Sequence, residues 1–109
     1  MDKPAASLQP AFYAWRIHEL QAIAKSCGYA IALHGSMTKD MDVIAVPWTK
    51  RALRAQTMVR RMCEAMDLSF DHESNPSKRP HGRRAWSLVF DNGCGYIDLS
   101  VMPRRMTND

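Results

Sequence analysis

The sequence has few cysteines and no long apolar run. Its three cysteines, Cys27, Cys63 and Cys94, are widely spaced and form no Cys-x-x-Cys pair. An odd number of scattered cysteines argues against a disulfide framework and against a zinc site, and is typical of reduced thiols. No segment approaches the roughly 20 apolar residues that a membrane-spanning helix requires. The first residues lack the apolar core of a signal peptide, so we expect a cytoplasmic protein without a membrane partner.

The length and composition indicate one ordinary globular domain. With 109 residues the chain is long enough to bury a core. A hydrophobic fraction of 46% and a charged fraction of 24% are usual for a protein of this kind. We therefore predict a single domain over residues 1–109, with loose tails at 1–7 and 104–109.

The basic residues exceed the acidic ones, and the formal net charge is +4. They gather in three stretches: Arg51, Arg54, Arg60 and Arg61; Lys78, Arg79, Arg83 and Arg84; Arg104 and Arg105. Such an excess suits an anionic partner, either the phosphates of a nucleotide or a nucleic-acid backbone. It is equally common on solvated helix faces, so charge alone does not decide between the two interpretations.

Two segments have the periodicity of helices. The first runs from about residue 8 to 27, begins near Gln9, and ends before Gly28, which is a good helix stop. Its expected apolar stripe is Leu8, Phe12, Trp15, Ala22, Ile23 and Cys27. The second helix is predicted over residues 49–66 with Thr49 as its cap, because apolar residues recur there at steps of three and four.

Short apolar segments predict the strands. We expect strands at 29–33, 42–46, 85–90 and 96–102, a further one near 68–73, and a surface loop at 74–82. The last two strands would form a hairpin around residues 91–95. The nearly continuous apolar run at 42–46 suggests burial on both faces of the sheet. This order predicts an α/β (α+β) fold, a mixed β-sheet with helices packed on it.

The stretch from residue 33 to 46 carries the strongest functional signal. Gly35 and Ser36 precede two aspartates, Asp40 and Asp42, that lead into a strand. Residues two apart on a strand project the same way, so the two carboxylates would lie side by side and repel each other. A divalent cation is the usual compensation, and Mg²⁺ is held by carboxylates together with substrate phosphates. The glycine-serine turn offers N–H groups and a hydroxyl to a phosphate.

This arrangement resembles the nucleotidyltransferase superfamily of the DNA polymerase β type, as a minimal single-domain member. The mark of the family is Gly-Ser, a connection, and acidic-x-acidic on a strand, followed by a third acid on a neighbouring strand. Asp98, inside the apolar segment 96–101, matches the third acid. The similarity spans roughly residues 29–102. A further similarity, to small phage-encoded members of the group, rests on segments 42–48 and 80–83.

The resemblance implies a metal-dependent transfer of a nucleoside monophosphate from an NTP to an acceptor that the sequence does not identify. Asp40, Asp42 and Asp98 would hold Mg²⁺ or Mn²⁺, and Asp98 would take a proton from the attacking hydroxyl. Gly35, Ser36 and Lys39 would hold the outer phosphates of the NTP. From the residues themselves, Arg83 in the basic loop is a candidate clamp for phosphate. His34 is interpreted as a bystander at the end of a strand.

Two other interpretations stay open. The connection between Ser36 and Asp40 is shorter than family members usually have, which favours a catalytically inactive module of the same fold that binds nucleic acid or a protein partner. A metal-dependent nuclease that uses the same acids is the third. The sequence leaves undecided the base, the acceptor, and whether a homodimer completes the pocket.

Overall fold

The computed structural model describes residues 9–34, 41–70, 77–78, 82–90 and 95–104. Its first element is helix α1 (Gln9–Ser26), in agreement with the predicted helix. The stripe that the helix buries is Tyr13, Ile17, Leu20 and Ala24, followed by Cys27. The expected stripe was wrong at Trp15, which is 66% exposed, and at Ala22, which is also exposed. Each helical residue turns by about 100°, so Trp15 lies on the side of the helix away from Tyr13.

Gly28 ends α1 and begins the turn to the first strand. Its N–H donates to the carbonyl of Lys25, and its φ of +88° lies in the left-handed region that favours glycine. A Cβ at this position would lie 2.6 Å from the hydroxyl of Thr49 and 2.7 Å from the Cα of Ala52. The turn therefore requires glycine both for its backbone angle and for the close approach of the segment after the second strand.

The strands form one mixed sheet. They are β1 (Tyr29–His34), β2 (Met41–Pro47), β3 (Leu68–Phe70), β4 (Ser77–Lys78), β5 (Arg84–Phe90) and β6 (Tyr96–Val101). Their order across the sheet is β1-β2-β6-β5-β3, and β4 pairs with β5. The central strands β2 and β6 are parallel, whereas the other described pairs are antiparallel. The predicted fold class is confirmed.

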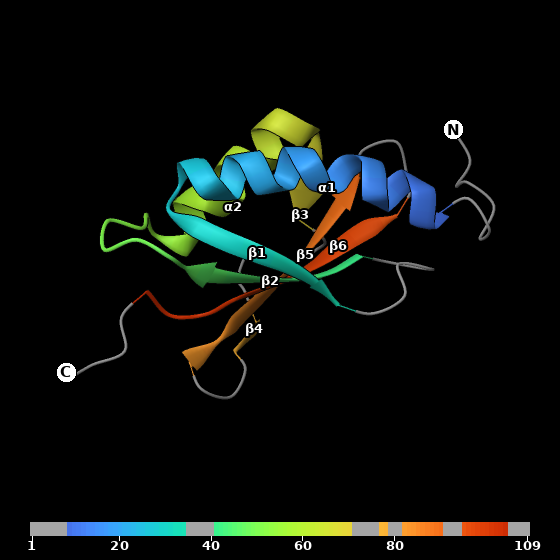
Figure 1. Cartoon of the computed structure of the whole chain (residues 1–109). Helices are drawn as coiled ribbons and strands as arrows, with labels where there is room; N and C mark the ends of the chain where they lie inside the picture. The colour runs from blue at the N-terminus through green and yellow to red at the C-terminus, as the bar shows by residue number, and fades with distance from the viewer. Residues whose placement is uncertain (1–8, 35–40, 71–76, 79–81, 91–94, 105–109) are drawn as a thin grey trace.

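Helices α1 and α2 (Ala55–Met66) cover one face of the sheet (Figure 1). The core between the layers includes Met41, Val43, Leu88, Ile97 and Leu99, all fully buried. Residues that alternate with these point to the other face and are only partly buried. The expectation that β2 is buried on both faces was therefore wrong, because no described helix covers the second face. No described helix is long and apolar enough to cross a membrane.

Helix α2 begins six residues later than predicted. Thr49 does not cap it, because residues 48–53 bond to the turn after α1 instead. The N–H groups of Trp48 and Thr49 donate to the carbonyl of Gly28, and that of Leu53 donates to the carbonyl of Cys27. These bonds hold the segment in a non-helical path. The helix then starts after Arg54, which is extended and makes no capping hydrogen bond with its side chain.

The chain between α2 and β5 differs from the prediction in one respect. Asp67 ends α2 with a φ of 55° and is followed by the short strand β3. Ser77 and Lys78 were expected in a loop but form β4, because they pair with the start of β5. The residues between β3 and β4 lie outside the described part of the chain.

Candidate active site

Two of the predicted acids lie directly opposite each other on the central strands. Asp42 of β2 is the register partner of Asp98 of β6. The residues on either side of each acid are fully buried against the helices, so both aspartates point to the uncovered face. Neighbouring strands are about 4.8 Å apart, which brings the two carboxylates close together. Like charges directly opposite each other destabilise a sheet unless they are compensated.

A row of polar side chains continues from this pair to the neighbouring strands. On the β5 side, Ser87 is the partner of Asp98, and its Oγ donates a hydrogen bond of 3.2 Å to Asp98 Oδ1. On the β1 side, His34 is the partner of Asp42 and is exposed. The register thus places His34 and Ser87 on the same face as the acids. Sequence reasoning treated His34 as a bystander and did not consider Ser87.

The pair of acids lies in a shallow hollow of about 190 Å³ on the uncovered face. Arg83, the predicted phosphate clamp, lines the same hollow, together with Ser87 and Ser100. The structure therefore brings together Asp42, Asp98 and Arg83, three of the residues singled out in the sequence. Among the described residues, neither carboxylate forms an ion pair with a lysine or an arginine.

The other predicted site residues, Gly35, Ser36, Lys39 and Asp40, lie outside the described residues. They lie in the sequence between β1, which ends at His34, and β2, which begins at Met41. Within the described residues, no group of three or more histidine, cysteine, aspartate and glutamate side chains is placed to hold a metal ion. The described acids of the hollow are a pair, and a third ligand would have to come from elsewhere.

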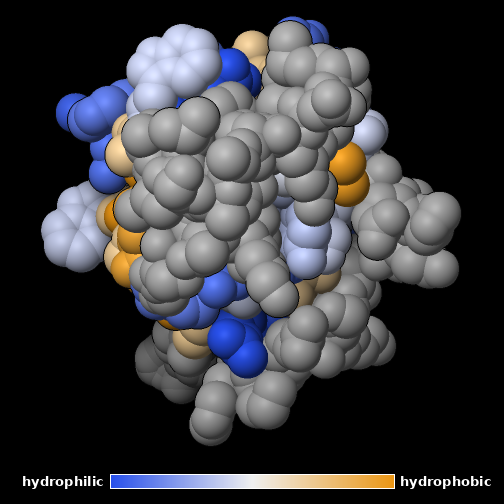
Figure 2. All heavy atoms as spheres, turned by 90° about the vertical axis from the view of Figure 1, so that its right-hand side faces the viewer, coloured by the Kyte–Doolittle hydropathy of each residue, from blue (hydrophilic) through white to orange (hydrophobic). Residues whose placement is uncertain are grey.

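Figure 2 looks at the end of the molecule where β1 ends and β2 begins. The described side chains visible there are partly hydrophilic and partly hydrophobic, and the hydrophobic ones form separate patches at the sides. Asp42 lies near the start of β2 and Asp98 near the start of β6.

Comparison with known proteins shows a similarity of fold. No family model matches the sequence, and no curated protein matches it. The structure is similar to that of a cytoplasmic RNA terminal U-transferase, with a TM-score of 0.56 and 14% sequence identity. The similarity covers 88% of this chain but 30% of that protein. Nearly the whole described fold of this chain is therefore similar to a part of a terminal U-transferase.

Proposed function

We propose that the chain is a metal-dependent nucleotidyltransferase-like protein that transfers a nucleoside monophosphate from an NTP to an acceptor. The observation that carries the proposal is the position of Asp42 opposite Asp98 on adjacent parallel strands of the uncovered face. The similarity of fold to a terminal U-transferase supports the same class of chemistry. The motif Gly35-Ser36, with Asp40 and Asp42 after it, supports it from the sequence.

The acids suit a hard divalent cation. Carboxylate oxygens are preferred ligands of Mg²⁺, and no lysine or arginine within the described part of the chain forms an ion pair with either acid. Asp42 and Asp98, with Asp40 as the proposed third ligand, would hold Mg²⁺ or Mn²⁺. A cation bound there would neutralise negative charge on the triphosphate and make the acceptor hydroxyl more acidic.

The protein's own groups would then divide the remaining work. Asp98 would accept the proton of the acceptor hydroxyl, which attacks the α-phosphorus while pyrophosphate leaves. The hydrogen bond from Ser87 engages Oδ1 of Asp98 and fixes the orientation of the carboxylate. Arg83 at the same hollow would bind a phosphate oxygen through its guanidinium. The outer phosphates would lie against Gly35, Ser36 and Lys39.

The test is transfer of label from α-labelled NTPs to single-stranded RNA acceptors in the presence of Mg²⁺, with the released pyrophosphate measured in parallel by a coupled assay. We expect label on the acceptor with the wild-type protein and loss of transfer with Asp42→Asn and with Asp98→Asn. Glu64→Gln is the matched control, because it removes one carboxylate from the exposed face of α2. Wild-type turnover by the Asp42 variant would remove this assignment.

A second candidate is a non-catalytic module of the same fold that binds nucleic acid. The chain spans 30% of the U-transferase to which it is similar, and its net charge of +4 suits a phosphate backbone. Binding of RNA that needs no metal and weakens steeply with salt, without release of pyrophosphate, would favour this candidate.

A further inference from the structure

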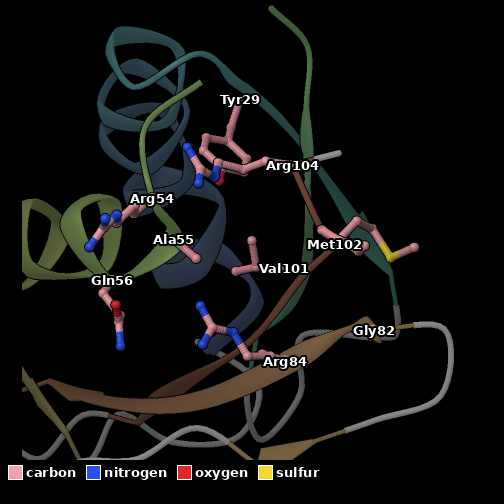
Figure 3. A pocket seen from close by; sticks show the side chains of 10 residues that line it. Tyr29, Arg54, Ala55, Gln56, Gly82, Arg84, Val101, Met102 and Arg104 are labelled. Carbon is pink, nitrogen blue, oxygen red and sulfur yellow. The ribbon is translucent and has the colours of Figure 1, made fainter. Parts of the chain in front are cut away.

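A second cavity, of about 380 Å³, opens at the other end of the sheet strands, on the side of the helices. It is formed where the start of α2 meets the starts of β1 and β5 and the residues that follow β6 (Figure 3). Its lining includes three arginines from three different segments, Arg54, Arg84 and Arg104. We call it the arginine pocket. None of the described residues that line it is acidic.

Two of the three guanidinium groups are held in place. The guanidinium of Arg84 lies over the ring of Trp86 at 5.4 Å from its centroid, and Arg104 donates a hydrogen bond of 3.4 Å to the carbonyl of Ala52. Figure 3 shows Arg84 pointing from β5 toward the start of α2, with Arg104 beside the ring of Tyr29. Guanidinium groups held in this way lose little freedom when they bind a ligand.

The phenol of Tyr29 is influenced by the charges of both Arg84 and Arg104. Burial raises the pKa of the Tyr29 phenol, and the positive charges of Arg104 and Arg84 act against that rise. Both charges thus act on the same phenol, whose hydroxyl donates to the carbonyl of Leu53 at 2.7 Å. Guanidinium groups are always charged in proteins, so their presence around one cavity without a described carboxylate costs energy that an anion would offset.

The start of α2 adds uncharged donors to the same pocket. Ala55 and Gln56 line the pocket and occupy the first turn of the helix, where backbone N–H groups have no acceptor within the helix. Arg54, the residue before them, makes no capping hydrogen bond with its side chain. The positive end of the helix dipole and the three guanidinium groups thus favour the same sign of ligand charge.

We propose that the arginine pocket binds phosphate groups, either those of a free nucleoside polyphosphate or those of a nucleic-acid backbone. The planar fork of arginine matches the oxygens of a phosphate, and a pocket of a few hundred Å³ is of the usual size for a small ligand. The pocket is separate from the acidic hollow. Arg83, just before β5, lines the hollow, whereas Arg84, the first residue of β5, lines the pocket.

The test measures binding in EDTA, so that neither a cation nor catalysis is involved. The probes are tripolyphosphate, ATP and a single-stranded oligouridylate without a terminal phosphate. Isothermal titration calorimetry measures the Kd of each probe. We expect the Kd to rise about tenfold or more in Arg54→Gln and in Arg84→Gln, because each removes a charged donor to phosphate. Arg60→Gln, on the exposed face of α2, is the matched control and should change the Kd by less than about threefold.

The pattern among the probes distinguishes the sources of phosphate. Losses confined to tripolyphosphate and ATP identify a site for free nucleotides, and losses confined to the oligouridylate identify a site for the backbone. Equal weakening in the control and in the pocket variants, or no binding of any probe by the wild type, would overturn the proposal. Arg54 is exposed, so its variant should keep the wild-type circular dichroism and melting temperature. We expect Asp42→Asn to bind the phosphate probes with the wild-type Kd. Phosphate binding in the arginine pocket can therefore be tested separately from the proposed catalysis.

Discussion

Replacing Asp42 by asparagine should stabilise the protein while it removes the response to metal. Asp42 and Asp98 are register partners on strands about 4.8 Å apart, so their charges are separated by about 5 Å. Coulomb's law gives a repulsion of about 0.8 kcal/mol at a dielectric constant of 80 and about 3 kcal/mol at 20. Both side chains are partly exposed, which favours the lower end of this range. We expect Asp42→Asn to raise the free energy of unfolding by about 1 kcal/mol in EDTA.

The assay is urea unfolding of both proteins, with EDTA and then with Mg²⁺. At a Mg²⁺ concentration about ten times its Kd, the wild type should gain about 1.4 kcal/mol, whereas the variant should gain much less. The order of stability should therefore reverse when metal is added. A variant that is less stable than the wild type in EDTA would show that the carboxylates do not repel each other. A variant that gains as much stability from Mg²⁺ as the wild type would show that they do not share a cation. Glu64→Gln controls for the change in net charge.

Three further predictions concern other contacts. Gly28→Ala should destabilise the protein by about 2–4 kcal/mol in urea unfolding, because the residue has a positive φ and its Cβ would meet Thr49; a loss below about 1 kcal/mol would contradict this. Ser87→Ala should lower kcat about fivefold without changing the KM for NTP, since it removes the hydroxyl that donates to the β6 carboxylate; an unchanged kcat would contradict this. The raised pKa of Tyr29 means that its contribution to stability is complete below the unfolded pKa of 10.0 and is lost as the pH rises through the folded pKa. Tyr29→Phe should therefore lose less stability than the wild type between neutral pH and about pH 11, although loss of the bond to Leu53 costs about 1 kcal/mol at neutral pH; parallel losses in urea midpoints would refute this.

Local sequence patterns predicted the presence of the helices and strands better than the residues at which they begin and end. The strands could be located because apolar residues and turn residues alternate with short periods, and α1 because Gly28 stops it. The start of α2 could not be located from the sequence, because Thr49 has the side chain of a helix cap but its N–H donates to a turn that is distant along the chain. Trp15 was misplaced for a related reason, because an apolar residue near helical spacing can still lie on the wrong side of a long helix.

The candidate site depended on register, which short-range patterns do not determine. Asp98 was singled out because the family motif requires a third acid, but its pairing with Asp42 follows from a parallel contact between distant segments. Ser87 could have been found from the alternation of residues 85–90, which places it away from Trp86 and Leu88. A shift of one residue in the pairing of β5 with β6, however, would put Trp86 or Leu88 instead of Ser87 opposite Asp98. The similarity to phage-encoded members stays a prediction. The base specificity and the identity of the acceptor stay open.

The parallel contact between β2 and β6 also joins two separately paired halves of the sheet. β1 pairs with β2 in the first half and β5 with β6 in the second, and each half contributes one of the two described acids of the hollow. The described pair of carboxylates therefore forms only when the two halves are joined. Under the proposed function, occupancy of the cation site and closure of the seam would be one linked equilibrium, and metal affinity would report how firmly the two halves of the molecule are joined.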